Sequence, residues 1–304
     1  MKPIIHIQLP ELFNWNHCIQ FLKRDPHELL FHIKGNRLRK LFRWGEEEGL
    51  MEIAYLHHEH RLEIHQLAGN ISPRHYDKIL IYIKEWFDLN RSLRPFVSLS
   101  KNDRILRSIV SNYKGLRLIG IPDLFECMAW AIIGQQINLT FAFKLKNALI
   151  RLVETPLIFE GHEYYHFPST STIENLSTDT LRSIQFSRQK ADYIRIVARQ
   201  ISNNTLSKNA LLNLDSKEVE KRLTSIKGVG KWTSDYTRMK CLGDSTAFLI
   251  GDVGLQNALK RIQNLKSKPG KDEMLALSQG WKGWEAYATF YLWYYLLFSE
   301  DSLD

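Results

Sequence analysis

The fold is decided by the stretch Leu223-Thr-Ser-Ile-Lys-Gly-Val-Gly-Lys-Trp-Thr-Ser-Asp235, with one helix expected before it and another after it, through about Cys241. Gly228 and Gly230 flank one apolar residue and allow the chain to reverse between the two helices. They also leave backbone N–H groups uncovered at the amino terminus of the second helix, where a phosphate binds favourably. The stretch therefore predicts a phosphate-binding helical hairpin, although a tight turn packed in a core has the same pattern.

A single acidic residue follows about twenty residues later, in Phe248-Leu-Ile-Gly-Asp-Val-Gly-Leu255. Alone, Asp252 in this apolar loop is most simply a helix cap. Together, the hairpin and the acid resemble the helix-hairpin-helix (HhH-GPD) DNA glycosylase superfamily, named for its hairpin, Gly/Pro-rich loop and Asp. Ile250 and Gly251 replace the Gly-Pro pair of that motif and leave the acid in register. The resemblance implies that Asp252 is the catalytic residue.

A second segment supports the resemblance independently. The run Asp123-Leu-Phe-Glu-Cys-Met-Ala-Trp-Ala-Ile-Ile-Gly-Gln-Gln-Ile137 resembles the superfamily's helix-to-loop segment, whose tip enters the duplex where a nucleotide has been pulled out. By resemblance, Gln135 and Gln136 fill that gap, the alternative being an exposed polar helix end. The likeness includes residues 181–192 and covers nearly the whole chain from Leu116 onward.

The hairpin is expected to contact the DNA backbone. Lys227 and Lys231 supply positive charge that suits phosphates and positions a protein without reading sequence. The predicted contacts to DNA are Gln135, Gln136, Lys227, Gly228, Val229, Gly230, Lys231 and Thr233. The resemblance also implies a structural Na⁺ or K⁺ ion, held by the backbone carbonyls of Thr224, Ile226 and Val229.

The reaction type follows from the position two residues after the second hairpin glycine. In the superfamily, a lysine there attacks the sugar and goes on to nick the strand. This chain has Trp232 at that position, so the resemblance implies a monofunctional enzyme that uses water. The four-cysteine tail of the iron–sulfur branch is absent, and no cofactor is expected for the chemistry.

Within the superfamily the chain resembles the bacterial DNA-3-methyladenine glycosylase II branch, whose pocket for alkylated bases is lined with aromatic rings. The matching positions are Trp232 and Tyr236 after the hairpin, Trp293 at the end of residues 284–293, and Phe21 in residues 15–22. Core packing is the alternative for each ring. A base methylated on a ring nitrogen is positively charged, and each ring face attracts such a cation by about 0.5 to 2 kcal/mol.

The pattern of the rest of the chain indicates an α+β protein. Apolar residues alternate in twos between about Leu29 and Gln66, with turn signals at Gly35-Asn36, Trp44-Gly45 and Gly49, which predicts an antiparallel sheet. We expect a mixed α/β domain over residues 1–95, resembling a TATA-binding-protein-like domain, with helices at 15–22 and 73–87. Residues 96–304 are expected to be all-α, in two helical subdomains with the active-site cleft between them, and to include a long loop at 155–172.

Composition is consistent with a protein that binds a polyanion. The chain of 304 residues carries a formal net charge of +8. The amino terminus lacks the apolar stretch of a secretory signal, so a cytoplasmic protein, by resemblance in the bacterial cytosol and nucleoid, is expected. Cys18, Cys127 and Cys241 are expected to be reduced and structural, and no zinc site is assigned to the histidines at positions 57–65.

These features predict an enzyme that excises alkylated bases, of the 3-methyladenine and 7-methylguanine type, from damaged double-stranded DNA. The protein is expected to be a monomer without membrane attachment. Two alternatives stay open. One is a noncatalytic protein that uses the hairpin only to hold DNA, and the other is a glycosylase for oxidised or deaminated bases.

Overall fold

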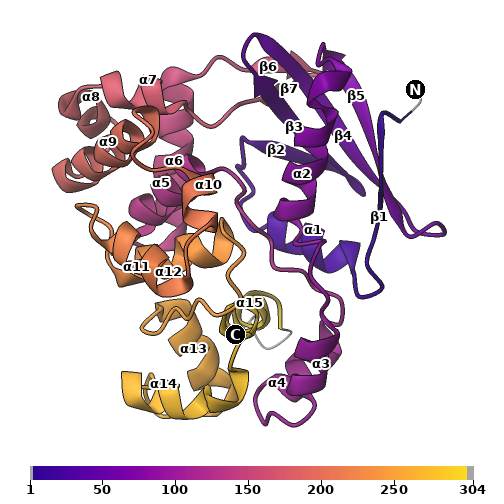
Figure 1. Cartoon of the computed structure of the whole chain (residues 1–304), viewed down its shortest axis with the longest axis vertical. Helices are drawn as coiled ribbons and strands as arrows, with labels where there is room; N and C mark the ends of the chain where they lie inside the picture. Colours follow the sequence, from indigo (N-terminus) through magenta and orange to yellow (C-terminus); the bar gives the residue numbers. More distant parts are fainter. Residues whose placement is uncertain (1–2, 300–304) are drawn as a thin grey trace.

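The computed structural model describes residues 3–299 and confirms the α+β class. An antiparallel sheet forms one side of the molecule, and helices form the other side and the lower half (Figure 1). The sheet has the strand order β1-β5-β4-β3-β2. Its strands are β1 (Ile5–Gln8), β2 (Phe31–Lys34), β3 (Arg37–Trp44), β4 (Glu47–Leu56) and β5 (Arg61–Gly69).

The helices are distributed over the whole remaining chain. The first two, α1 (Trp15–Leu22) and α2 (Tyr76–Trp86), match the predicted ranges closely, and α2 follows a 3₁₀ turn at Pro73–His75. The others are α3 (Arg94–Ser100), α4 (Leu106–Asn112), α5 (Leu124–Gly134), α6 (Leu139–Val153), α7 (Thr170–Asn175), α8 (Thr178–Ser183), α9 (Arg188–Ser202), α10 (Lys208–Leu212), α11 (Ser216–Thr224), α12 (Lys231–Lys240), α13 (Val253–Ile262), α14 (Lys271–Leu277) and α15 (Glu285–Phe298), with a second 3₁₀ turn at Gln279–Trp281.

Two details of the predicted pattern are wrong. Gly49 is not in a turn but inside β4, where it pairs with Phe42 and Gly69. The predicted long loop at 155–172 contains a hairpin of two short strands, β6 (Leu157–Phe159) and β7 (His162–Tyr164), so the second part of the chain is not all-α. Strands of three residues are too short for alternation to reveal.

One hydrophobic core joins the sheet to the helices. The predicted boundary at residue 95 therefore does not divide the buried side chains into two groups. Helix α1 from the amino-terminal part packs on α15 from the carboxyl end, with the rings of Phe21 and Phe290 4.6 Å apart and a hydrogen bond of 2.5 Å from the hydroxyl of Tyr294 to Gln20 Oε1. The amino terminus is thus placed beside the carboxyl-terminal helix. Within residues 3–299, no helix has the length and apolarity needed to cross a membrane.

A small charged cavity lies where the sheet meets α5 and α6. Its volume is about 50 Å³, and its lining includes Glu28, Lys40, Glu126 and Lys146. Lys146 pairs with Glu28 at 2.6 Å, while the carboxyl of Glu126 has no ion-pair partner among the described residues. Burial raises the pKa of Glu126 to about 7. The folded protein therefore binds a proton at Glu126 more tightly than the unfolded chain does.

Replacing Glu126 with Gln should remove a pH-dependent cost of folding. Because the pKa of Glu126 is higher in the folded protein than in the unfolded chain, its protonation stabilises the fold. This stabilisation is complete at pH values below the pKa of the unfolded chain and is lost as the pH rises through about 7. We therefore compare the free energy of unfolding of Glu126→Gln with that of the wild type at two pH values. The difference should favour the variant by about 1–3 kcal/mol more at about pH 9 than at about pH 5. Urea denaturation at the two pH values measures the difference. An equal effect at both would contradict the buried position of this carboxyl.

Candidate active site

A cleft of about 420 Å³ lies between α1, α5, α6, α12, α13 and α15. Its lining brings together all five residues predicted for the catalytic acid and the substrate pocket, which come from distant parts of the sequence: Phe21, Trp232, Tyr236, Asp252 and Trp293. The volume lies within the range typical of small-ligand sites. The cleft can therefore accommodate a group of the size of a nucleobase.

Asp252 is both the cap of α13 and a side chain of the cleft. Its Oδ1 accepts a hydrogen bond from the backbone N–H of Leu255 at 2.7 Å and another from the indole N–H of Trp293 at 2.8 Å. Its Oδ2 accepts from the indole N–H of Trp232 at 3.0 Å. Three donors from three elements thus fix the carboxylate. Hydrogen bonds to an ionised acceptor are stronger than those between neutral groups, so this arrangement holds a negative charge in a defined position.

The aromatic side chains form a continuous wall that starts at Asp252. Trp232 stacks on Tyr236 with ring centres 5.2 Å apart, and Trp293 lies 6.3 Å from Tyr236. The hydroxyl of Tyr236 accepts a hydrogen bond from the indole of Trp130 at 2.9 Å, and Trp130 stacks on Phe143. Burial raises the pKa of Tyr236, so its hydroxyl stays neutral at ordinary pH.

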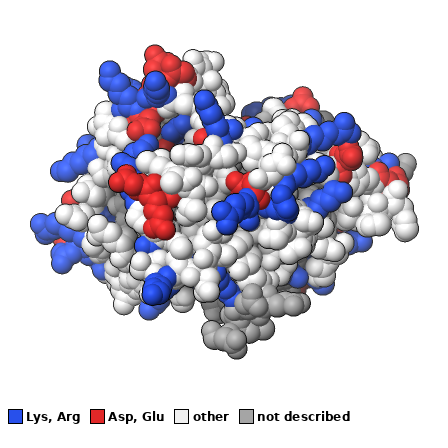
Figure 2. Space-filling model, turned by 90° about the horizontal axis from the view of Figure 1, so that it is seen from below, with Lys and Arg blue, Asp and Glu red and all other residues white. Residues whose placement is uncertain are grey.

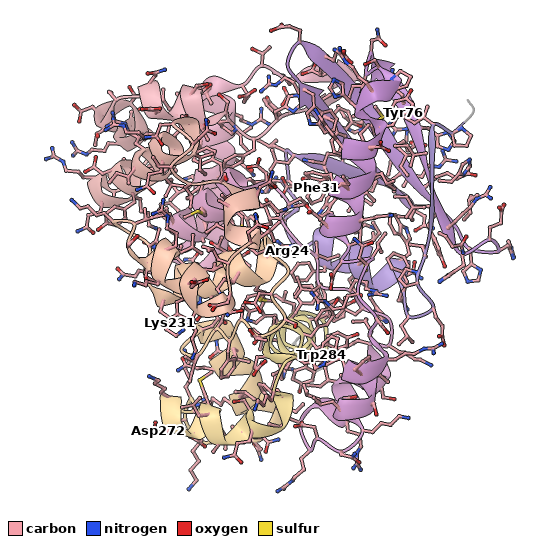
Figure 3. All side chains as sticks on the ribbon, viewed as in Figure 1. Arg24, Phe31, Tyr76, Lys231, Asp272 and Trp284 are labelled. Carbon is pink, nitrogen blue, oxygen red and sulfur yellow. The ribbon has the colours of Figure 1, made fainter. Side chains whose placement is uncertain are left out.

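Sequence reasoning missed several residues of the cleft. Trp130 lies in the predicted segment 123–137 without an assigned role, yet it extends the aromatic wall through Tyr236 and Phe143. Arg24 and Lys240 also line the cleft, and Asn257 does so from α13. The signal for Arg24 was its position two residues after the predicted segment 15–22, within one helical turn of Phe21. Figure 3 shows Arg24 near the middle of the molecule.

A separate groove follows the hairpin between α11 and α12. It is lined by the hairpin residues from Thr224 to Gly230, by Gln135 and Gln136, and by Ser187, Gln189, Lys190 and Tyr193 of α9 and its cap. The predicted hairpin and the predicted loop after α5 therefore share one surface. The contribution of α9 was not predicted, although residues 181–192 formed part of the resemblance.

The structural requirement for glycine differs between the two hairpin positions, 228 and 230. Gly228 has φ +91°, and a Cβ added there would lie 2.1 Å from an atom of the Tyr193 ring, so packing and conformation both require glycine. Gly230 has φ −85° as the cap of α12, and a Cβ there would meet no atom within 4 Å. The protein's own packing does not require glycine at position 230. Open space at a helix amino terminus is what close approach of a phosphate needs.

The two glutamines after α5 have separate positions. The side-chain amide of Gln135 donates to the carbonyl of Gly228 and to the hydroxyl of Thr233, both at 3.0 Å, and so fastens the loop to the hairpin. Gln136 is exposed, with φ +57°. Of the pair, Gln136 is therefore the side chain that is free to enter a gap in a duplex. The side chain of Thr233 is 2 % exposed and holds Gln135, so its predicted contact with DNA remains a prediction that would use the backbone of the first turn of α12.

The two hairpin lysines also differ. Lys231 pairs with Glu220 at 2.8 Å and with Asp235 at 3.2 Å, so its positive charge is already compensated within the protein. Lys227 is exposed, lines the groove, and has no acidic side chain within ion-pair distance among residues 3–299. The free positive charge of the hairpin is therefore that of Lys227.

Comparison with known families agrees with this geometry. Residues 129–283 match the family model described as HhH-GPD superfamily base excision DNA repair protein, and residues 31–128 match the 8-oxoguanine DNA glycosylase, N-terminal domain. The chain belongs to the HhH-GPD superfamily of base excision DNA repair proteins.

Particular relatives are similar over most or part of the chain. A DNA-3-methyladenine glycosylase of Bacillus subtilis is 38% identical over 296 residues, which cover 96% of this chain and 97% of that protein. DNA-3-methyladenine glycosylase 2 of Escherichia coli is 25% identical over 182 residues, or 59% of this chain and 60% of that protein.

Solved structures confirm the fold. The 3-methyladenine DNA-glycosylase of Archaeoglobus fulgidus superposes with a TM-score of 0.83 at 22% identity, covering 98% of this chain and 99% of that one. The 8-oxoguanine glycosylase/lyase of Clostridium acetobutylicum gives 0.72 at 19% identity, covering 97% of each chain. At these identities the likeness concerns the fold alone.

The two glycines provide a matched pair of substitutions. Gly228→Ala should destabilise the protein by about 2–4 kcal/mol, because the methyl group overlaps the Tyr193 ring and the backbone is left-handed. Gly230→Ala should cost at most about 1 kcal/mol, since the position is open. Thermal and urea denaturation measure both. Equal costs would show that the hairpin differs from the conformation described.

Proposed function

We propose that the protein is a monofunctional DNA glycosylase that excises alkylated purines, of the 3-methyladenine and 7-methylguanine type, by hydrolysis of the N-glycosidic bond. One observation carries the proposal. The carboxylate of Asp252 is fixed by three N–H donors at the edge of a cleft whose wall is formed by Trp232, Tyr236 and Trp293. The Bacillus subtilis relative at 38% identity is named DNA-3-methyladenine glycosylase.

The chemistry follows from the position of the acid. As the bond between the base and C1′ stretches, the sugar becomes an oxocarbenium ion, and a fixed carboxylate stabilises its positive charge. The base departs with the electron pair of the broken bond, the oxygen of a water molecule bonds to C1′, and the proton that the water loses passes to the solvent. A base already methylated on a ring nitrogen leaves as a neutral molecule, so strong acid assistance is unnecessary. The ring faces attract its positive charge beforehand.

Binding to double-stranded DNA is assigned to the hairpin groove. The N–H groups at the start of α12, the open space at Gly230 and the free charge of Lys227 suit a backbone phosphate. Gln136 is proposed to enter the duplex after the damaged nucleotide rotates out, a step that costs least for weakened base pairs. On the face shown in Figure 2, positive and acidic side chains are interspersed.

A structural Na⁺ or K⁺ ion at the hairpin is part of the proposal. Backbone carbonyls suit such an ion, and Thr224, Ile226 and Val229 are among the residues that line the groove. The carbonyl of Ile226 accepts one hydrogen bond, from the N–H of Val229 at 3.0 Å, which leaves a second lone pair. The ion would stiffen the turn and attract a phosphate. Among the described residues, no cluster of three or more His, Cys, Asp or Glu side chains could hold a metal.

Replacing Asp252 with Asn tests the proposed catalyst. The variant should lose at least about a thousandfold in the release of 3-methyladenine and 7-methylguanine, because the charge opposite the oxocarbenium ion is removed. Its affinity for the same duplex should stay within a few fold. Chromatography of the released bases and a DNA-binding titration measure the two quantities.

The wild-type protein provides the control for this experiment. It should release the methylated bases and leave an abasic site, without strand cleavage and without an adduct trapped by borohydride. DNA binding by the wild type without release of any base would favour the noncatalytic alternative. Release of oxidised or deaminated bases alone would favour the other alternative.

The two indole donors can be removed singly. Trp232→Phe leaves Oδ2 of Asp252 without its donor, and Trp293→Phe removes one of two donors to Oδ1. Each should lower the rate of base release by about tenfold or more while keeping a ring in the wall. Trp130→Phe is the matched control, because its indole bonds to Tyr236 rather than to the acid. The same loss in all three variants would show that the indoles act only by filling space.

A further inference from the structure

A second groove, which we call the α6 groove, adjoins the cleft at the start of α6. Its volume is about 660 Å³, and it runs along one face of α6 from Leu139 to Arg151, against the segment 24–29 that follows α1. Arg24 and Leu139 line both the cleft and the α6 groove, so the two hollows share a border. The reaction proposed above uses the cleft and the hairpin groove and gives the α6 groove no role.

The segment 134–140, from the end of α5 to the first turn of α6, borders all three hollows. Gln135 and Gln136 line the hairpin groove, the middle of the segment lines the cleft, and Leu139 and Thr140 line the α6 groove. The exposed Gln136 therefore has the hairpin groove at its own position and the α6 groove one helical turn further along the chain. A duplex that is opened at Gln136 continues past this side chain in both directions. The α6 groove is thus in place to meet that duplex away from the hairpin.

Three exposed polar side chains line the α6 groove without a hydrogen-bond or ion-pair partner in the part of the chain that the structure describes. Thr140 and Lys144 lie one helical turn apart on α6, and His27 lies on the opposite edge, in the segment after α1. They supply a hydroxyl, an ammonium group and an imidazole, all of which can donate to a phosphate oxygen. Between residues 3 and 299, the backbone N–H groups of Leu139 and Thr140 also have no acceptor, and they belong to the amino terminus of a helix of fifteen residues.

Apolar side chains line the same groove beside these donors. Leu29 and Phe143 are almost completely buried, and Leu139 is 45% exposed at the border with the cleft. A sugar–phosphate backbone has the same two characters, because carbon-rich deoxyribose alternates with charged phosphate. The carbon atoms of the sugar gain from contact with an apolar surface, and the phosphate gains from charged donors next to it. The lining of the α6 groove therefore suits a nucleic acid backbone.

The charges of the α6 groove leave one uncompensated cation at its surface. Among the described residues that line the groove, Asp25 is the only acidic one; it is 6% exposed, and its Oδ1 accepts from the backbone N–H of His27 at 2.9 Å. Arg151, at the far end of the groove, pairs with Glu163 at 2.7 Å. Lys144 is exposed, and no carboxylate within residues 3–299 lies within ion-pair distance of its amino group. Lys144 is therefore the charge that the groove offers to an anion.

We propose that the α6 groove is a second binding surface for the backbone of the damaged duplex, in which Lys144 and Thr140 contact a phosphate that the hairpin does not reach. This inference rests on the proposed glycosylase function. Contacts at the hairpin and at the α6 groove hold the duplex on both sides of Gln136. They keep this side chain in the gap and the mouth of the cleft over the extruded nucleotide. Both surfaces position the DNA without reading its sequence.

The first test measures the affinity of Lys144→Met and of the wild type for a duplex that contains an abasic-site analogue, over a range of salt concentrations. Lys144→Met should bind about fivefold more weakly or worse at about 50 mM salt, and the slope of log K against log salt should fall by about 1, because one phosphate contact is lost. Lys144→Arg should recover most of the affinity. Lys78→Met is the matched control, since Lys78 of α2 is an exposed helical lysine without an ion pair between residues 3 and 299 and outside both grooves. It should leave the affinity and the slope unchanged.

The second test locates the phosphate. Single phosphates of the duplex are replaced, one at a time on each strand, by uncharged methylphosphonates. Binding of the wild type should weaken at two separate sets of positions. Lys144→Met should lose its sensitivity at one set and keep it at the other, and Lys227→Met, at the hairpin, should show the opposite pattern. Loss of sensitivity at the same positions in both variants, or at none in Lys144→Met, would overturn the proposal, as would equal affinities of Lys144→Met and Lys78→Met.

These binding measurements need no catalysis, so they separate this inference from the proposed function. A protein that shows the expected dependence on Lys144 and releases no base would support the α6 groove and reject the glycosylase function. A protein that releases 3-methyladenine and binds DNA equally well with and without Lys144 would do the reverse. Thermal denaturation of Lys144→Met should match that of the wild type within about 2 °C, because the side chain is exposed and makes no contact that folding requires.

Discussion

The carboxylate of Asp252, held by the N–H groups of Leu255, Trp232 and Trp293, is the constraint on which the rest of the site depends. These donors come from α13, α12 and α15, so the three helices must pack correctly before the acid has a position. The same two indoles that hold the acid begin the aromatic wall. Fixing the charge and shaping the cleft are therefore one structural task, because each indole presents its N–H to the acid and its ring to the wall.

The amino-terminal part of the chain is part of this arrangement. Helix α1 packs on α15 and contributes Phe21, while Arg24 follows directly after it. The sheet supports α1 and α2 through a core that continues into the helical region. The sheet thus acts on the site through α1, which places one ring and one positive charge in the cleft that also contains the acid.

Sequence reasoning predicted the residues whose role depends on backbone geometry or on a motif with fixed spacing. The hairpin glycines, Asp252 and the four predicted rings belong to this group. It did not find Trp130, because α5 is apolar on all sides and no position in it stands out. It could not give the side-chain partners of Lys231 and Thr233, because these depend on helical register. In the structure, Lys231 reaches Asp235 one turn later and Thr233 faces the interior. The β6–β7 hairpin was missed since three-residue strands carry too little pattern.

The most direct test of the account is a crystal structure of the protein bound to a duplex that contains a pyrrolidine analogue of the abasic sugar, a cation that mimics the oxocarbenium ion. The account predicts that the pyrrolidine nitrogen lies about 3 Å from a carboxylate oxygen of Asp252. It also predicts that the hairpin N–H groups contact a backbone phosphate and that both indole bonds to the acid are kept. A sugar analogue bound outside the cleft, with Asp252 still serving only as the cap of α13, would contradict it.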